Sequence, residues 1–328
     1  MEDKKQLTWK EAFFASPGPA SLKKAGVLSL KGLCMGSADV IPGVSGGTIA
    51  LITGIYENLI QALKSLDATM VKKVLNLDLK GALAHVHVRF LLFLFAGIGV
   101  AIISLARLMN FLLHHYPVFT WSLFFGLIAA SILVVSRQVA RWTPRTGISL
   151  VAGIVVAFLI VNLIPLETTD AHWFIFLCGL IAICAMILPG ISGAFILLIL
   201  GKYEFITATL KNPFLPQHFI IIFVFCLGCL IGLLSFARLL NYLLQNYRHL
   251  TLAFLTGLMV GSMPKIWPWQ EILHTKIIRG KPHVIWGSNI MPQTLNSEVY
   301  LAVGLAIIGF IAVLIIERLA RGKESALS

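Results

Sequence analysis

The chain has 328 residues, of which 58% are hydrophobic and 12% are charged, with a formal net charge of +12 and a mean hydropathy of +0.89. Soluble domains carry about a quarter charged residues, so this composition excludes an ordinary soluble protein. The net charge alone would suit nucleic acid, but the basic residues flank apolar stretches, where membrane orientation and anionic lipid explain them better. We expect an all-α, polytopic integral membrane protein that contacts membrane lipids and binds no nucleic acid.

The first 31 residues form a basic segment. They contain six lysines and the breaker Pro17-Gly18-Pro19, without the continuous apolar core or cleavage site of a signal peptide. We expect residues 1–31 to lie along the cytoplasmic membrane surface.

A motif rich in glycine, PGVSGGT at residues 42–48, interrupts the first apolar region, residues 33–63. Proline and glycine break a helix and free backbone groups that hydrocarbon cannot satisfy, so this segment must be buried in protein or face a polar cavity. A helix that starts near Thr48 would direct its free amides at the loop, which favours an anion such as phosphate. The alternative is that the small residues only allow close helix packing. The predicted helix-breaking residues are Pro42 and Gly43, and the predicted phosphate-binding residues are Ser45, Gly46, Gly47 and Thr48.

The motif occurs twice. Residues 42–57 and 189–204 are identical at ten of sixteen positions, at an offset of 147. Residues 104–131 and 235–262 also align, at an offset of 131. Apolar composition makes leucine matches frequent, but it does not pair proline, arginine, asparagine and glutamate in the same order. The chain is therefore a duplication. In the second copy the predicted helix-breaking residues are Pro189 and Gly190, and the predicted phosphate-binding residues are Ser192 and Gly193.

The charges of the loops predict that the two copies are inserted in opposite orientations. Lysines precede and follow the first motif, so residues 33–63 should enter and leave the membrane on the cytoplasmic side as a re-entrant hairpin. The acidic loop with Glu167 and Asp170 should lie outside, and the second hairpin should enter from there. The basic 264–298 loop fits its predicted outer position less well. Inverted repeats place the working site near the membrane midplane, between the repeats.

This topology divides the chain into a first repeat, 32–165, a second repeat, 166–317, and a cytoplasmic tail, 318–328. In the first repeat the hairpin 33–63 is followed by spans at 90–113, 118–136 and 147–164. In the second repeat the hairpin 172–206 is followed by spans at 218–244, 250–263 and 299–316.

Two arginines lie inside apolar spans. Arg107 and Arg238 each precede an asparagine, Asn110 or Asn241, by three residues, so the two side chains share a helix face. An arginine at the centre of a membrane helix costs at least about 2.5–3.5 kcal/mol and usually pairs or lines a pathway. We predict that both arginines bind phosphate, with the asparagines assisting coupling or gating; the alternative is snorkelling toward the helix ends.

Three carboxylates accompany the motifs. Asp39 precedes the first motif, and Glu57 and Glu204 follow the two motifs at equivalent positions. They are predicted to pair with the arginines or to bind a coupling proton or sodium ion, and an ordinary interfacial position is the alternative. Met186 stands at the position equivalent to Asp39, so the first loop is the more polar of the two.

The cysteines and histidines predict neither a metal site nor a cofactor. All five cysteines lie in apolar stretches, and Cys226-x-x-Cys229 has no second pair. We interpret them as small apolar residues.

The stretch GSADVIPGVSGGT, residues 36–48, resembles the signature of the polyprenyl-phosphate transporter family. The likeness extends over roughly residues 25–320 and includes LPGISG at 188–193. The resemblance implies a transporter rather than an enzyme, located in the bacterial inner membrane. It also implies that undecaprenyl phosphate, a lipid carrier used in cell-wall synthesis, returns from the outer to the cytoplasmic leaflet. The charges of the loops predict that both termini lie in the cytoplasm.

The alternatives are a transporter of a water-soluble anion and an enzyme such as a lipid phosphatase. An ion-coupled transporter of a water-soluble anion would use the same phosphate site but a closed aqueous cavity. A lipid phosphatase would need a nucleophile beside a base, or a metal cluster, and no histidine lies near either serine motif in the sequence.

Overall fold

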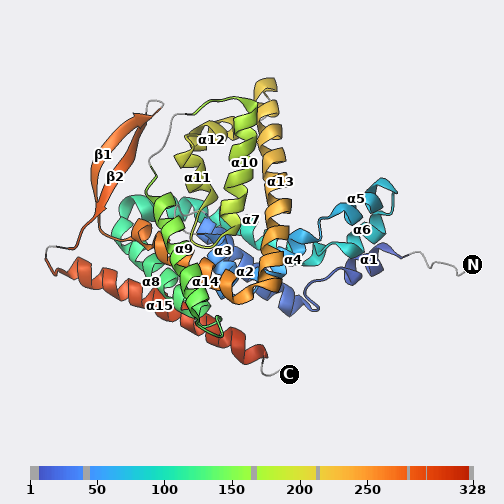
Figure 1. Ribbon diagram of the computed structural model, residues 1–328, viewed down its shortest axis with the longest axis horizontal. Coiled ribbons are helices and arrows are strands. Elements are labelled where there is room, and N and C mark those ends of the chain that lie inside the picture. Colours follow the sequence, from blue (N-terminus) through green and yellow to red (C-terminus); the bar gives the residue numbers. More distant parts are fainter. Residues whose placement is uncertain are drawn as a thin grey trace, which may run out of the picture.

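The computed structural model describes residues 7–39, 45–163, 168–211, 215–278, 281–292 and 294–324. Within these ranges nearly every element is a helix, and the sheet is a two-stranded hairpin (Figure 1). An all-α, multi-pass membrane protein is therefore confirmed. Five helices are long and apolar enough to cross a membrane: α7 (Val88–His115), α8 (Pro117–Ser136), α9 (Pro144–Val161), α13 (Pro216–Asn246) and α15 (Ser297–Glu324).

The first hairpin is longer than the sequence predicted. Its first helix, α2 (Leu22–Asp39), begins about ten residues early and includes three lysines of the expected N-terminal segment. After the loop follow two short helices, α3 (Gly46–Ile52) and α4 (Tyr56–Lys64). The helices α1 (Trp9–Ala15), α5 (Ala68–Leu75) and α6 (Leu79–His85) lie at the same end of the molecule, where α1 packs against α6 (Figure 1).

The second copy repeats this order. Its elements are α10 (His172–Ile187), α11 (Gly193–Ile199), α12 (Tyr203–Lys211), then α13 and α14 (Arg248–Ser262). In both hairpins the two short helices are joined at a glycine with positive φ, Gly54 at 71° and Gly201 at 65°. Side chains with a Cβ rarely adopt this conformation, and α11 and α12 are bent there by 115°. The duplication found in the sequence thus extends to the backbone of the turn.

The same close helix contact also appears in both copies. α2 packs along α7, and α10 packs along α13. A Cβ on Gly32 would collide with the carbonyl oxygen of Leu94, and one on Gly179 would collide with that of Phe225. Gly32 and Gly179 are equivalent at the offset of 147, and Leu94 and Phe225 are equivalent at the offset of 131. Both copies therefore use a glycine at the same position to bring equivalent helices into backbone contact.

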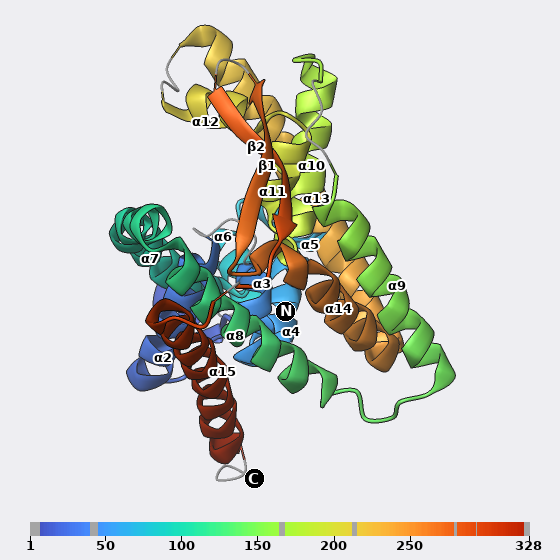
Figure 2. The same cartoon turned by 90° about the vertical axis from the view of Figure 1, so that its left-hand side faces the viewer.

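The long helices that follow these pairs pack against helices of the other copy. α8 of the first copy packs along α15 of the second, and α14 of the second packs along α9 of the first (Figure 2). Gly126 faces the carbonyl oxygen of Ala306 in one pair, and Gly257 faces that of Leu150 in the other. The two copies are therefore interlocked. Their opposite insertion in the bilayer stays a prediction.

One predicted span, 250–263, differs from the rest. It forms α14, which has 15 residues and is buried along most of its length, as Leu252, Ala253, Leu255, Leu258 and Met259 show. A helix covered by other helices does not need the full apolar length of a lipid-facing span.

The 264–298 segment, expected to be a loop, contains a short 3-10 helix, η1 (Met263–Ile266), and a β-hairpin. Strands β1 (Gln270–Ile278) and β2 (Lys281–Asn289) pair antiparallel, with Gln270 opposite Asn289. The hairpin projects from the helices beyond the end of α14 (Figures 1 and 2).

The apolar core surrounds the first hairpin. Tyr56 and Ile60 of α4 are fully buried in one cluster with Leu94 of α7 and Leu255 of α14. Most residues of α3 are buried as well. From Ser45 onward the first motif therefore lies inside protein, which suits the free backbone groups at a break between helices.

Candidate functional site

The two Pro-Gly-x-Ser-Gly loops meet near the centre of the molecule. Residues 40–44, with Pro42 and Gly43, lie outside the described residues, so the first loop is described from Ser45 onward. The second loop runs from Leu188 to Ser192 and includes Pro189 and Gly190. Side chains of the first hairpin bind the backbone of this second loop, so the repeats touch through the motif that they share.

Ser45 caps α3 and also binds the second loop. Its backbone is extended, with φ −119° and ψ 131°, and its Oγ accepts the N–H of Gly47 at 3.1 Å. The same hydroxyl donates to the carbonyl oxygen of Leu188 at 3.0 Å. Because the residue is 1% exposed, both bonds are shielded from water and fix the start of α3 against the second copy.

Two further side chains complete this contact. Thr48 Oγ1 accepts the N–H of Gly190 at 3.1 Å, and the hydroxyl of Tyr56 donates to the carbonyl oxygen of Ile187 at 3.2 Å. Thr48 and Tyr56 are 1% and 2% exposed. Gly190 has φ +87°, a conformation that glycine adopts at little cost. A buried set of cross-repeat hydrogen bonds thus satisfies the irregular backbone of the second loop.

Asp39 holds the N-terminus of α3. Its Oδ1 accepts the N–H of Gly46 at 2.7 Å. The next two N–H groups, of Gly47 and Thr48, bind the hydroxyl and the carbonyl oxygen of Ser45. Free amides at a helix start attract negative charge, so the carboxylate of Asp39 takes the place expected for a phosphate. In this conformation the carboxylate of Asp39 binds the start of α3, and phosphate binding there stays a prediction.

The second loop offers fewer polar contacts. Ser192 precedes α11 with N-cap angles, φ −101° and ψ 132°, but its side chain makes no capping hydrogen bond. Gly193, the first residue of α11, packs so closely on Ala182 that a Cβ there would lie 2.6 Å from its carbonyl oxygen. Phe195 takes the place of Thr48, and the Nζ of Lys265 lies 5.0 Å from its ring centroid.

Of the two predicted arginines, Arg238 has a described side chain, and its hydrogen bonds lie outside the loops. Arg107 and Asn110 belong to α7, but their side chains lie outside the described part. Arg238 is exposed on α13 and donates to the carbonyl oxygens of Leu234 at 3.0 Å and of Leu66 at 3.3 Å. Asn241, one turn further, is 5% exposed. Among the described residues Arg238 has no hydrogen bond to either loop, so its contact with phosphate stays a prediction.

The two glutamates lie in the first turns of α4 and α12, the helices after the hairpin turns. Glu57 forms an ion pair with Arg248 at 2.6 Å, and both side chains are about half exposed. Glu204 lies in the first turn of α12. Of the three carboxylates predicted for coupling, Asp39 is the one in contact with the first loop.

Two lysines at the hairpin turns were missed by the sequence analysis. The Nζ of Lys31 donates to the carbonyl oxygen of Thr53 at 2.6 Å. Lys202 is 0% exposed, and its Nζ donates to Asp170 Oδ1 at 2.6 Å and to the carbonyl oxygen of Thr168 at 2.7 Å. The available signal was that Lys202 replaces Ile55 inside an otherwise apolar repeated segment.

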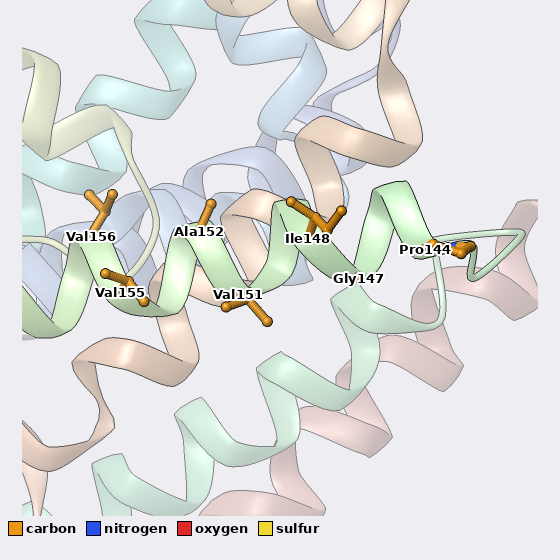
Figure 3. Close-up of a pocket in the computed structure, with 7 residues that line it drawn as sticks. All are labelled: Pro144, Gly147, Ile148, Val151, Ala152, Val155 and Val156. Atoms are coloured by element: carbon orange, nitrogen blue, oxygen red, sulfur yellow. The ribbon is translucent and has the colours of Figure 1, made fainter.

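The outer face of α9 carries an apolar depression remote from the loops (Figure 3). All seven lining residues belong to this one helix, and Ile148 and Val151 are 70% and 56% exposed. This surface suits contact with lipid tails rather than a specific site.

Comparison with known proteins agrees with the geometry. Residues 35–281 match the profile of the undecaprenyl phosphate translocase-like family. The chain belongs to this family. It is 44% identical over 273 residues to a polyprenyl-phosphate transporter of Vibrio cholerae, covering 82% of this chain and 87% of that protein. It is 28% identical over 258 residues to a polyprenyl-phosphate transporter of Staphylococcus aureus, covering 73% of this chain and 85% of that protein. No solved structure matches the chain.

The family match includes both loops and the helices that join them. The resemblance expected from the signature at residues 36–48 is thereby confirmed. The relatives are named as transporters, which agrees with the expectation of a transporter rather than an enzyme.

Proposed function

We propose that this protein returns undecaprenyl phosphate from the outer to the cytoplasmic leaflet of the bacterial inner membrane. The names of the family and of its two relatives support the substrate class. Five membrane-spanning helices and interlocked repeats supply a transporter's architecture. The observation that supports the proposal is the buried contact of Ser45 and Thr48 with the second loop, because the start of α3, where we propose that phosphate binds, lies at this contact.

In this proposal the phosphate displaces Asp39 from the start of α3. The N–H of Gly46 and the hydroxyls of Ser45 and Thr48 then bind the phosphate oxygens, and Ser192 and Gly193 contribute from the second loop. The cross-repeat hydrogen bonds must open for this, which couples head-group binding to movement of one repeat against the other. Arg107 is proposed to bind the phosphate as well, and Arg238 would do so after releasing the carbonyl oxygen of Leu66.

Asp39 is the proposed site of coupling. When a phosphate and a carboxylate share one helix start, their repulsion favours a proton on the carboxylate. A proton taken up at the outer side would then travel inward with the lipid. Sodium coupling, and roles for Glu57, Glu204, Asn110 and Asn241, remain alternatives that the same assay separates.

The direct test follows undecaprenyl phosphate in proteoliposomes. Lipid in the exposed leaflet is measured by a phosphatase that cannot cross the membrane, before and after a pH gradient is imposed. Wild-type protein is expected to move the lipid and to respond to the gradient, whereas Asp39→Asn should lose the response and Arg107→Ala with Arg238→Ala should lose transport. Met186→Leu, at the position equivalent to Asp39, is the matched control.

Each part of the proposal has its own contrary result. No lipid movement by the wild type would remove the function, and uptake of soluble phosphate instead would favour the water-soluble anion. An unchanged pH response in Asp39→Asn would remove its coupling role. The cytoplasmic position of both termini and the inverted topology are tested by labelling Met70→Cys and Thr169→Cys, which should react from opposite sides.

A further inference from the structure

A second apolar cavity, of about 330 Å³, lies between α8, α15 and the segment that follows α14. Small residues form its α8 side, Ser122, Gly126 and Ala129, and larger ones of α15, such as Ile307 and Phe310, face them. Ser122 is 1% exposed, so its hydroxyl adds little polarity to the cavity surface. An apolar guest of restricted size fits this space.

The third wall is aromatic and fixed in place. Trp267 packs edge-to-face on Phe125 with 5.3 Å between ring centroids, and Trp269 packs on Trp267 at 5.7 Å. The indole N–H of Trp267 donates to the carbonyl oxygen of Ile290 at 2.9 Å. That bond turns the polar atom of Trp267 to the backbone, which leaves ring carbons to line the cavity.

The cavity opens toward the surface that lipid would cover. Val303 and Ile307 on its rim are 45% and 53% exposed, and Ile308 and Ile311 on the neighbouring face of α15 are 58% and 48% exposed. A lipid tail therefore reaches the cavity from the bilayer without crossing water.

A lysine, Lys265, lies next to the aromatic wall in the sequence. Lys265 precedes Trp267 by two residues, so their Cα atoms lie within about 7.6 Å. Its Nζ lies over the ring of Phe195, which belongs to α11 directly after the second loop. Among the described residues Lys265 has no ion pair. Gly190 of the second loop packs on Met259 and Ser262 at the end of α14, one turn before Lys265. Lys265 thus contacts the helix that follows the second loop and lies two residues before the aromatic wall of the cavity.

We propose that Lys265 and this cavity form an entry site for an isoprenoid phosphate, upstream of the paired loops. The inference rests on the proposed function and adds a second binding place on the same path. Lys265 holds the phosphate, and the cavity holds the first part of the tail. Since a dry cavity of about 150 Å³ accommodates benzene, this cavity takes about two or three isoprene units, and the rest of the tail stays in the bilayer.

The cavity acts by shape rather than by hydrophobic driving force. A tail that leaves the bilayer for a protein cavity exchanges one apolar environment for another, so packing decides the gain. A rigid wall of Phe125, Trp267 and Trp269 suits a methyl-branched isoprenoid better than a straight alkyl chain. Single-methyl differences in shaped apolar pockets give about tenfold discrimination.

Binding of two alkyl phosphates to the full-length protein in detergent tests the site. Farnesyl phosphate and pentadecyl phosphate have the same head group and the same carbon number but differ in tail shape. The wild type should bind farnesyl phosphate about tenfold more tightly. Val303→Trp, which fills the rim of the cavity, should remove this preference and leave the affinity for pentadecyl phosphate unchanged. Ile308→Trp, on the outer face of the same helix, should keep it.

The head-group half is tested separately. Lys265→Gln should weaken binding of both phosphates about tenfold, as expected for loss of a charged hydrogen bond, and should keep the preference for the branched tail. Equal affinity of the wild type for both tails, or an unchanged preference in Val303→Trp, would overturn the cavity assignment alone. Unchanged affinities in Lys265→Gln would overturn the cation. A wild type that binds neither phosphate would overturn the entry site, whereas the proposed function is decided by transport of undecaprenyl phosphate in proteoliposomes.

Discussion

The two hairpins descend from one sequence but are fixed at opposite ends. The first is anchored at its loop, where the hydroxyls of Ser45, Thr48 and Tyr56 bind the second loop. The second makes no such bonds with its own Ser192 and is anchored at its turn by the buried Lys202. Duplication thus preserved the helices and the turn glycines, while the polar contacts diverged. We therefore expect function to depend most on the polar contacts that differ between the two hairpins.

The largest difference in the free energy of unfolding is expected between variants at the two hairpin turns. Lys202→Met should lower the free energy of unfolding by about 3 kcal/mol, the lower end of the range for breaking a buried ion pair, because Asp170 is half exposed. Lys31→Met should cost less, since Lys31 is only partly buried. Thermal unfolding in detergent measures both. Equal losses of unfolding free energy would mean that both lysines stabilise their turns to the same extent.

The next difference is expected at the serines. Ser45→Ala removes an N-cap and a cross-repeat hydrogen bond, both buried, and should cost about 2 kcal/mol. Ser192→Ala removes no capping bond and should cost at most about 0.5 kcal/mol. The same unfolding measurement applies, and lipid transport should follow the order. A larger loss of unfolding free energy in Ser192→Ala than in Ser45→Ala would contradict this assignment.

The tyrosines offer a matched pair with a single atom removed. Tyr56→Phe deletes a buried hydroxyl bound to Ile187 and should cost about 1 kcal/mol. Tyr203, its equivalent, is 41% exposed, so Tyr203→Phe should be nearly neutral. If both variants unfold at the wild-type temperature, the Tyr56 hydroxyl does not hold the loops together.

The smallest effect is expected for the glutamates. Glu57→Gln breaks a half-exposed ion pair with Arg248, which should contribute at most about 1 kcal/mol and less at high salt. Unfolding measured at low and high ionic strength should therefore converge for wild type and variant. A loss that persists at high salt would show that the pair matters beyond surface electrostatics.

The helices could be predicted from sequence because long apolar stretches have few other solutions. The duplication was visible because rare residues such as Pro42 and Pro189 recur in order. The partner of each helix was not visible, since α8 and α14 present similar apolar faces to any neighbour. The β-hairpin at 270–289 was missed because its sequence mixes charged and branched residues without a clear alternation.

The residue types at the first loop predicted an anion site, which stays a prediction. They did not indicate that Asp39 itself binds the start of α3, and the reason is physical. That Asp39 fills the start of α3, while Arg238 turns to Leu66, depends on which partners the fold brings within reach. Such choices are set by distances between segments far apart in the chain, and composition carries no record of them.

The packing of α9 and α15 against helices of the other copy has a consequence for biogenesis. When the ribosome has released the first 165 residues, α8 and α9 are inserted while the glycine faces that receive α15 and α14 are still uncovered. Neither half can complete its own packing, so separately expressed halves should be degraded alone and rescued when produced together. By the same logic, a single copy made alone would complete its packing only by pairing with a second copy.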